Sequence, residues 1–331
     1  MKGFIMFAST RVPKSEVMGP TMTLHPESVR MLEELAALEL PPIYTQSVPD
    51  ARERLVAATE PLTEVGLVVD ERFDGPAGPI RIRRYHPRDE PDDPTNLVLF
   101  FHGGGWVIGS IESHEDVCRR LANACSAVVV SVDYRLAPEA VCPAAVDDCM
   151  AALRWANGNR SDWGVRGITA VCGDSAGGNL AAVVAQRAMG AGVGPVDYQV
   201  LLYPVTDANL DTGSYLEFAE GYGLERESMR WFWRQYMGGQ DPTQPVASPL
   251  RAKTLAGVPS AYVVTAEYDT LRDEGDAYAA AMRDAGVDVA GECVPGVLHG
   301  FLLHGDRFSE VDEVFLRIGQ QVRKLGAAKL T

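Results

Sequence analysis

One stretch of this chain decides its fold: Val171-Cys172-Gly173-Asp174-Ser175-Ala176-Gly177-Gly178-Asn179. It matches the pattern Gly-x-Ser-x-Gly around Ser175. Apolar, β-prone residues at 167–172 precede the stretch, and strong helix formers at 179–188 follow it, ending at Gly190. A strand, a sharp turn and a helix in this order predict a nucleophile elbow.

The predicted turn explains the glycines. It forces Ser175 into a strained backbone conformation, and side chains at the flanking positions would collide with the strand and the helix. The Ser175 hydroxyl would then stand at the N-terminus of the helix, where the helix dipole favours the negative charge of an acyl-transfer transition state. The alternative is a plain Gly/Ser turn between a strand and a helix.

A second motif directly follows an apolar strand and reads His102-Gly103-Gly104-Gly105-Trp106. Successive glycines let backbone N–H groups turn toward a developing oxyanion. Gly104 and Gly105, together with the N–H of Ala176, are the predicted donors. A phosphate-binding loop is the alternative, but the motif lacks both a Gly-Lys-Ser/Thr ending and dinucleotide-binding spacing. His102 is interpreted as a brace for the loop.

Two partners for the serine are predicted after later strands. A serine hydroxyl is a weak nucleophile, so it needs an imidazole to take its proton and a carboxylate to orient that imidazole. Asp269 follows the predicted strand 261–266, and His299 follows the predicted strand 289–294. Both therefore lie at the edge of the sheet where Ser175 stands. The alternatives are Glu267 or Asp273 as the carboxylate, and His304, His114 or His25 as the base.

Strands and helices alternate through most of the chain, which predicts a parallel sheet covered by helices on both faces. The expected strands are 66–73 and 80–85, as an antiparallel hairpin, then 97–101, 127–132, 168–172, 198–203, 261–266 and 289–294. The expected helices are 24–38, 50–59, 114–124, 143–157, 179–188, 225–237, 272–285 and 309–325.

Two segments depart from this alternation. The first two helices precede every strand and are candidates for a lid, and 204–259 interrupts the pattern. The aromatic helix 225–237 has the composition of a core element. On an insertion at the catalytic face, however, Trp231 and Trp233 would form an apolar substrate wall together with Trp106.

The composition of the chain limits which partners it can bind and which cellular compartment it is expected to occupy. A formal net charge of −15 over 331 residues argues against nucleic acid, which binds basic surfaces. No apolar run approaches the ~20 residues that span a bilayer, and no signal peptide is evident, so a cytoplasmic location is expected. The six cysteines form no Cys-x-x-Cys pair, and the histidines lack ligand spacing, so neither a disulfide framework nor a metal site is expected.

Six motifs together resemble the hormone-sensitive-lipase-like branch of the α/β-hydrolases, the bacterial carboxylesterases. They are His102-Gly103-Gly104-Gly105-Trp106, Tyr134-Arg135-Leu136-Ala137-Pro138-Glu139, Gly173-Asp174-Ser175-Ala176-Gly177-Gly178, Ser248-Pro249-Leu250, Asp269-Thr270-Leu271-Arg272-Asp273 and His299-Gly300-Phe301. The resemblance runs from about residue 81 to residue 325. It implies an α/β-hydrolase fold with an eight-stranded, mostly parallel sheet.

The resemblance implies a cap built from 1–62 and 207–247, over a catalytic domain made of 63–206 and 248–331. It also implies a serine carboxylesterase that hydrolyses short- to medium-chain acyl esters without a cofactor, and a homodimer is a further expectation. The family triad corresponds to Ser175, Asp269 and His299, and its oxyanion hole to Gly104, Gly105 and Ala176. The alternatives are an amidase or thioesterase on the same triad, or a ligand-binding relative without catalysis.

Overall fold

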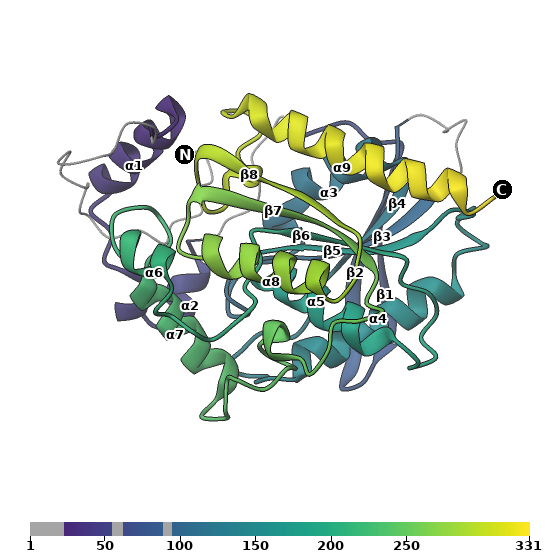
Figure 1. The fold of residues 1–331 in the computed structure, drawn as a ribbon, viewed down its shortest axis with the longest axis horizontal. Helices are drawn as coiled ribbons and strands as arrows, with labels where there is room; N and C mark the ends of the chain where they lie inside the picture. Colours follow the sequence, from purple (N-terminus) through teal and green to yellow (C-terminus); the bar gives the residue numbers. More distant parts are fainter. Residues whose placement is uncertain (1–22, 55–61, 89–94) are drawn as a thin grey trace.

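A single sheet of eight strands organises the part of the chain described by the computed structural model, namely residues 23–54, 62–88 and 95–331 (Figure 1). The strand order is β1-β2-β4-β3-β5-β6-β7-β8. The strands are β1 (Leu67–Gly75), β2 (Gly78–His86), β3 (Asn96–Phe101), β4 (Ala127–Val132), β5 (Thr169–Asp174), β6 (Tyr198–Leu202), β7 (Ser260–Tyr268) and β8 (Val289–Leu298). β2 pairs antiparallel with β1 and with β4, and every other neighbouring pair is parallel. The predicted fold class is confirmed.

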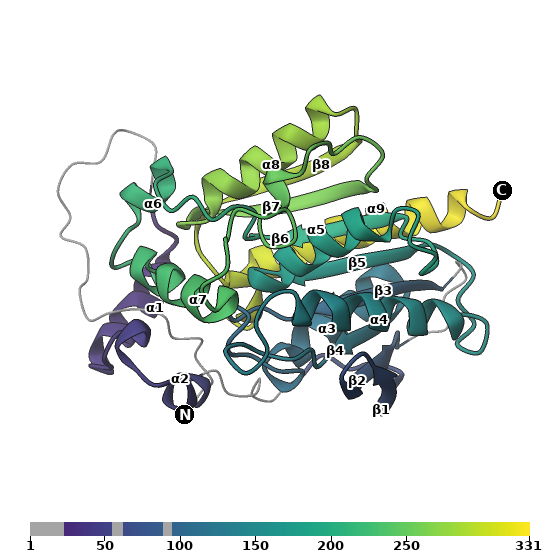
Figure 2. The same cartoon turned by 90° about the horizontal axis from the view of Figure 1, so that it is seen from below.

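Helices cover both faces of the sheet. They are α1 (Pro26–Ala37), α2 (Val48–Arg52), α3 (Glu115–Cys125), α4 (Ala144–Gly158), α5 (Ala176–Ala188), α6 (Gly213–Glu217), α7 (Arg226–Met237), α8 (Arg272–Asp284) and α9 (Ser309–Ala328). α3 and α9 pack together on one face, and α4, α5 and α8 lie on the other (Figures 1 and 2). No helix in the described ranges is both long and apolar enough to cross a membrane.

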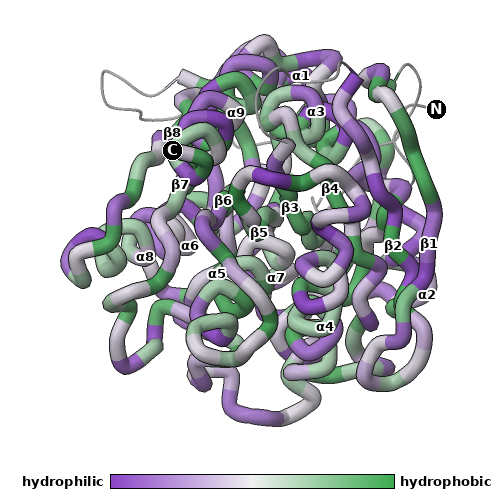
Figure 3. The backbone as a smooth tube through the Cα atoms, turned by 90° about the vertical axis from the view of Figure 1, so that its right-hand side faces the viewer, coloured by the Kyte–Doolittle hydropathy of each residue, from purple (hydrophilic) through white to green (hydrophobic). Residues whose placement is uncertain are grey.

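The central strands β3, β4, β5 and β6 are buried at every position because each face of the sheet is covered. Along β3, Val98 and Phe100 point into the core under α3 and α9, whereas Leu99 and Phe101 point into the core under α4 and α5. Figure 3 shows the resulting hydrophobic segments at β3 and β4 in the middle of the molecule. Burying each such side chain contributes about 1.5–3 kcal/mol, so these strands supply much of the stability that holds the site rigid.

The N-terminal helices α1 and α2 lie beside α6 and α7 at one end of the sheet (Figures 1 and 2). α6 and α7 belong to the segment 204–259 that interrupts the alternation. α7 contacts the short 3-10 helix Ile43–Thr45, and α6 contacts α8. The predicted helix 50–59 instead begins at Val48, because the Ser47 hydroxyl accepts a hydrogen bond from the Asp50 N–H at 3.3 Å and caps it. The second half of that prediction lies outside the described residues.

Candidate active site

The serine elbow joins β5 to α5 with Ser175 at φ 55° and ψ −118°. The left-handed φ is costly for a side-chain-bearing residue and is held by the surrounding packing. A Cβ on Gly177 would lie 1.9 Å from the carbonyl oxygen of Phe101, the last residue of β3. This oxygen belongs to the backbone and cannot move aside, so the glycine allows α5 to pass this close to β3.

Replacing Gly177 with alanine is therefore expected to destabilise the protein by several kcal/mol, through a clash between two backbone segments of the core. The control is Gly158→Ala at the end of α4, where an added Cβ meets no atom within 4 Å. Thermal unfolding followed by circular dichroism measures both variants. A melting temperature of Gly177→Ala equal to that of the control would contradict this account of the elbow.

Ser175, His299 and Asp269 form a continuous hydrogen-bonded line. The Ser175 Oγ lies 3.0 Å from His299 Nε2, and His299 Nδ1 lies 2.7 Å from Asp269 Oδ2. The other oxygen, Asp269 Oδ1, accepts a hydrogen bond from the Leu271 N–H at 2.9 Å. The side chains of His299 and Asp269 are 3% and 0% exposed. The carboxylate is thus fixed at both oxygens, and it orients the imidazole toward the serine.

The rival carboxylates and bases have other partners. Glu267 accepts a hydrogen bond from the Gly296 N–H at 2.7 Å, and Asp273 accepts one from the Ser214 N–H at 2.7 Å. His25 caps α1 by accepting a hydrogen bond from the Glu27 N–H. His114 contacts Asp174, and His304 is buried beyond β8. The structure brings only Asp269 and His299 into line with Ser175 among the candidates weighed from the sequence.

The glycine-rich loop lies directly against the elbow. The Gly103 N–H donates a hydrogen bond to Asp174 Oδ1 at 2.8 Å. Gly104 and Gly105 have φ values of +110° and +59°, which residues with a Cβ rarely adopt. A Cβ on Gly105 would also lie 2.2 Å from the ring of Phe232 on α7. Both the backbone conformation and the close approach of α7 therefore require glycine at position 105.

His102 lies inside the protein behind this loop, in the bracing position expected from the sequence. Its Nδ1 donates a hydrogen bond to the Gly103 carbonyl oxygen at 2.8 Å, and its ring stacks on Tyr134 at 4.3 Å. The Tyr134 hydroxyl donates a hydrogen bond to the His102 carbonyl oxygen at 2.7 Å. Burial, with the nearby His114, lowers the pKa of His102 to about 4, so the ring is neutral near pH 7.

Buried neutral histidines should make the protein less stable in mild acid. Burial, with the charge of Arg307, also lowers the pKa of His304 to about 4. Below about pH 6.5 this histidine is protonated in the unfolded chain but stays neutral in the folded chain. The free energy of unfolding therefore falls as the pH drops, until the pH reaches about 4. The full loss of unfolding free energy from His304 is about 3 kcal/mol.

Urea unfolding between about pH 7.5 and pH 4.5 measures this loss. The difference in unfolding free energy between the wild type and His304→Gln at pH 7.5 gives the packing cost of the substitution. That difference should shrink, or change sign, as the pH falls, because glutamine has no proton to take up. A difference that stays constant over this range contradicts the expectation.

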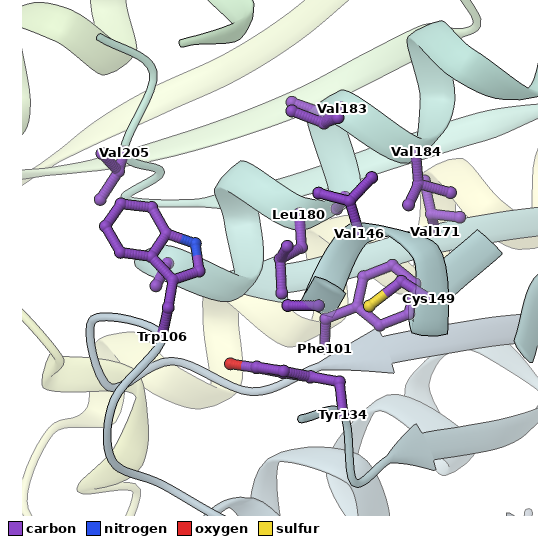
Figure 4. Packing of buried hydrophobic residues seen from close by; sticks show 14 of the residues in the cluster. Phe101, Trp106, Tyr134, Val146, Cys149, Val171, Leu180, Val183, Val184 and Val205 are labelled. Carbon is purple, nitrogen blue, oxygen red and sulfur yellow. The ribbon is translucent and has the colours of Figure 1, made fainter. Parts of the chain in front are cut away.

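The predicted substrate-wall tryptophans lie inside an aromatic cluster. Trp106 is fully buried and stacks on Tyr236 with ring centroids 4.2 Å apart. Trp233 lies 4.8 Å from Trp106, and Trp231 is also buried. Figure 4 shows the indole of Trp106 in the cluster that includes Leu180. Trp233 on α7 thus packs against Trp106, which follows Gly105, and contact of the three tryptophans with substrate stays a prediction.

Sequence reasoning missed two contacts at the site. The ring of Tyr203, just after β6, meets the imidazole of His299 edge-on with centroids 4.8 Å apart. Its position at the carboxyl end of a parallel strand was the signal that could have identified it. Phe232 was seen in the sequence as one aromatic residue of its helix, but nothing there indicated that it faces Gly105.

The Arg52 guanidinium joins the N-terminal segment to the glycine-rich loop. Arg52, at the end of α2, donates from Nε to the Val107 carbonyl oxygen at 2.9 Å and from Nη2 to the Ala137 carbonyl oxygen at 3.1 Å. It also forms a two-pronged ion pair with Glu139 at 2.8 and 2.7 Å. The N-terminal segment is therefore anchored next to the glycines.

The fold and this line of side chains define a hydrolase with a serine nucleophile. The family model described as alpha/beta hydrolase fold matches residues 98–303. The esterase LipI of Mycobacterium tuberculosis is 44% identical over 71% of this chain and 75% of its own length, and an ethyl acetate hydrolase of Pseudomonas putida is 37% identical over 76% and 80%. The solved structure of a hyperthermophilic esterase from Pyrobaculum calidifontis is similar with a TM-score of 0.85 and 41% identity, covering 92% of this chain and 100% of that one. The chain belongs to the alpha/beta hydrolase fold family, in its hormone-sensitive-lipase-like branch.

Proposed function

We propose that the protein is a serine carboxylesterase that hydrolyses short- to medium-chain acyl esters through an acyl-enzyme on Ser175. The observation that carries the proposal is the line from Ser175 through His299 to Asp269, with separations of 3.0 and 2.7 Å. The relatives support the class of substrate, since they are named esterase, carboxylic ester hydrolase, ethyl acetate hydrolase and arylesterase.

In the first half-reaction, His299 Nε2 takes the proton of Ser175 as the serine oxygen attacks the ester carbonyl carbon. Asp269 holds the imidazole in the tautomer with a proton on Nδ1, and its charge stabilises the imidazolium that forms. The carbon–oxygen bond to the alcohol then breaks, and the leaving alkoxide takes the proton from His299. The acyl group remains on the serine.

In the second half-reaction, water replaces the serine as nucleophile. His299 removes a proton from the water as it attacks the acyl-enzyme, and returns the proton to the departing serine oxygen. The same side chains therefore serve both steps, and the protein returns to its starting protonation state.

The N–H groups of Gly104, Gly105 and Ala176 are the proposed donors to the oxyanion in both steps. Ala176 is the first residue of α5, so its N–H lies at the positive end of a helix dipole. Donors fixed before the reaction stabilise the developing charge without reorganising, and one such donor contributes about 3–4 kcal/mol to catalysis. The strained backbone of the loop and the elbow is consistent with that role.

The cap is proposed to set the size of the acyl group. Segments 1–62 and 207–247 would form it over the catalytic domain of 63–206 and 248–331. Trp106, Trp231 and Trp233 are proposed as its apolar wall, and Phe232 belongs with them because it lies against Gly105. A packed aromatic wall this close to the oxyanion loop favours small acyl groups over long ones.

Hydrolysis of p-nitrophenyl esters of increasing chain length, measured beside matched p-nitroanilides and thioesters, tests the reaction class. The proposal predicts the highest kcat/KM on short and medium esters. Faster turnover of anilides or thioesters would identify an amidase or a thioesterase instead. Labelling by a fluorophosphonate, with the adduct located on Ser175 by mass spectrometry, distinguishes either enzyme from a ligand-binding relative.

A cytoplasmic location and a homodimer stay predictions. The location is supported by the cysteines, because Cys118, Cys125, Cys142, Cys149 and Cys172 are free and buried. Unpaired thiols are typical of proteins that fold in a reducing compartment. Among the described residues, no group of three or more potential ligands is placed to hold a metal ion.

A further inference from the structure

A buried carboxylate lies between the elbow and the glycine-rich loop. Asp174 is the last residue of β5, directly before Ser175, and its side chain is 5% exposed. Its Oδ1 accepts a hydrogen bond from the Gly103 N–H at 2.8 Å. A Cβ on Gly103 would lie 2.4 Å from Asp174 Oδ2, so the loop and the carboxylate are in direct contact. One side chain thus connects the segment that carries the nucleophile to the segment that carries Gly104 and Gly105.

His114 completes this connection from a third segment, the turn before α3. Its Nε2 lies 3.3 Å from each oxygen of Asp174. Its Nδ1 lies 2.8 Å from the Ser113 hydroxyl, which also accepts a hydrogen bond from the Ser110 N–H at 2.9 Å. The imidazole is therefore held by its own turn, and it holds the carboxylate in place.

The charge of this carboxylate calls for an explanation, because burying an ion is unfavourable unless its partners compensate. Burial alone would raise the pKa of Asp174, but His114, and to a smaller extent His102 and His299, hold it below the usual value. The group is therefore ionised near pH 7. An ionised acceptor makes a shorter and stronger hydrogen bond to a backbone N–H than a neutral acceptor does.

We propose that Asp174 is a positioning residue that sets the distance between Ser175 and the oxyanion-hole N–H groups, an inference that rests on the proposed function. It acts through the Gly103 N–H, and His114 fixes its orientation. Glycine has many accessible backbone conformations, so the loop at Gly104 and Gly105 needs such a restraint to stay in the one observed. Displacing catalytic groups by about 1 Å costs on the order of 100-fold in rate, so the restraint acts on kcat.

The test compares Asp174→Asn with Asp148→Asn as a matched control. Asp148 is a buried carboxylate on α4 that pairs with Arg135 at 2.7 Å, and its hydrogen bonds go to Arg135 rather than to the elbow or to Gly103. With p-nitrophenyl butyrate, Asp174→Asn is expected to lower kcat by about 10- to 100-fold while KM changes less than about 3-fold. Its affinity for a trifluoromethyl ketone, which binds as an oxyanion, should fall by a similar factor. Asp148→Asn should keep kcat near that of the wild type even where its melting temperature drops.

Three results would overturn the inference: an Asp174→Asn variant with kcat within twofold of the wild type, a loss confined to KM, or an equal loss in Asp148→Asn. If Asp174→Asn does not fold, His114→Gln decides, with a fall in kcat of about fivefold at constant KM in support and an unchanged kcat against. Ser175→Ala is measured on the same ester. If Ser175→Ala keeps more than about a tenth of the wild-type activity, the proposed function itself is refuted. If Ser175→Ala is inactive at that level and Asp174→Asn is fully active, only the positioning role is refuted.

Discussion

Ester hydrolysis by the Ser175→Ala variant is expected to be slower than that of the wild type by about 10⁴- to 10⁶-fold in kcat. Ser175 offers the only oxygen that lies within hydrogen-bonding distance of His299 Nε2 among the described residues, at 3.0 Å. Alanine leaves the imidazole and the glycine-rich loop in place but removes the oxygen that is proposed to form the acyl-enzyme. The residual rate then comes from water attacking a bound and polarised ester.

The measurement is the steady-state rate on p-nitrophenyl butyrate with an enzyme preparation free of wild-type carry-over. Ser248→Ala is the control, since Ser248 is a buried serine whose hydroxyl donates to the Pro242 carbonyl oxygen at 2.7 Å. It should keep nearly full activity. If Ser175→Ala retained more than about a tenth of the activity, the nucleophile would be misassigned.

Asp269→Asn is expected to lower kcat by about 10⁴-fold. The carboxylate accepts hydrogen bonds from His299 Nδ1 at 2.7 Å and from the Leu271 N–H at 2.9 Å, so both of its oxygens act as acceptors. An amide in the same place presents an NH₂ group to one of these donors. The imidazole then carries its proton on Nε2, and that nitrogen can no longer accept the proton of Ser175.

Asp273→Asn provides the control for Asp269→Asn, because both carboxylates follow β7 and both were candidates from the sequence. Asp273 accepts a hydrogen bond from the Ser214 N–H of α6 at 2.7 Å, so its substitution should change the melting temperature more than kcat. A larger kcat loss in Asp273→Asn than in Asp269→Asn would reverse the assignment of the carboxylate.

The features that sequence could predict are those whose cause is local. The apolar run 97–101 indicated a strand covered on both faces, and β3 occupies 96–101. The elbow was predictable because any chain in this turn is too crowded for side chains two residues before and after the serine, and glycines stand at both positions around Ser175. Asp269 and His299 were predictable because parallel strands deliver their following residues to one edge of the sheet.

The features that sequence could not predict depend on contacts between distant segments. The hydrogen bond from Gly103 to Asp174 joins residues 71 positions apart, and that from Arg52 to Val107 joins residues 55 apart. The periodicity of apolar residues along the sequence carries no information about pairs so far apart. Helix α6 was missed because its five residues are too short to produce a helical pattern, and it depends on its contact with α8. Likewise, the aromatic residues of 225–237 indicated burial, but not which ring would face Gly105.

The anchor made by Arg52 has a practical consequence for enzyme engineering. Exchanging the N-terminal segment between esterases is an obvious way to alter acyl preference, since that segment is proposed to contribute to the cap. In this protein the exchange also removes the guanidinium that donates hydrogen bonds to the backbone at Val107 and Ala137. We therefore expect a chimaera to keep the loop geometry only if an arginine is retained at this position.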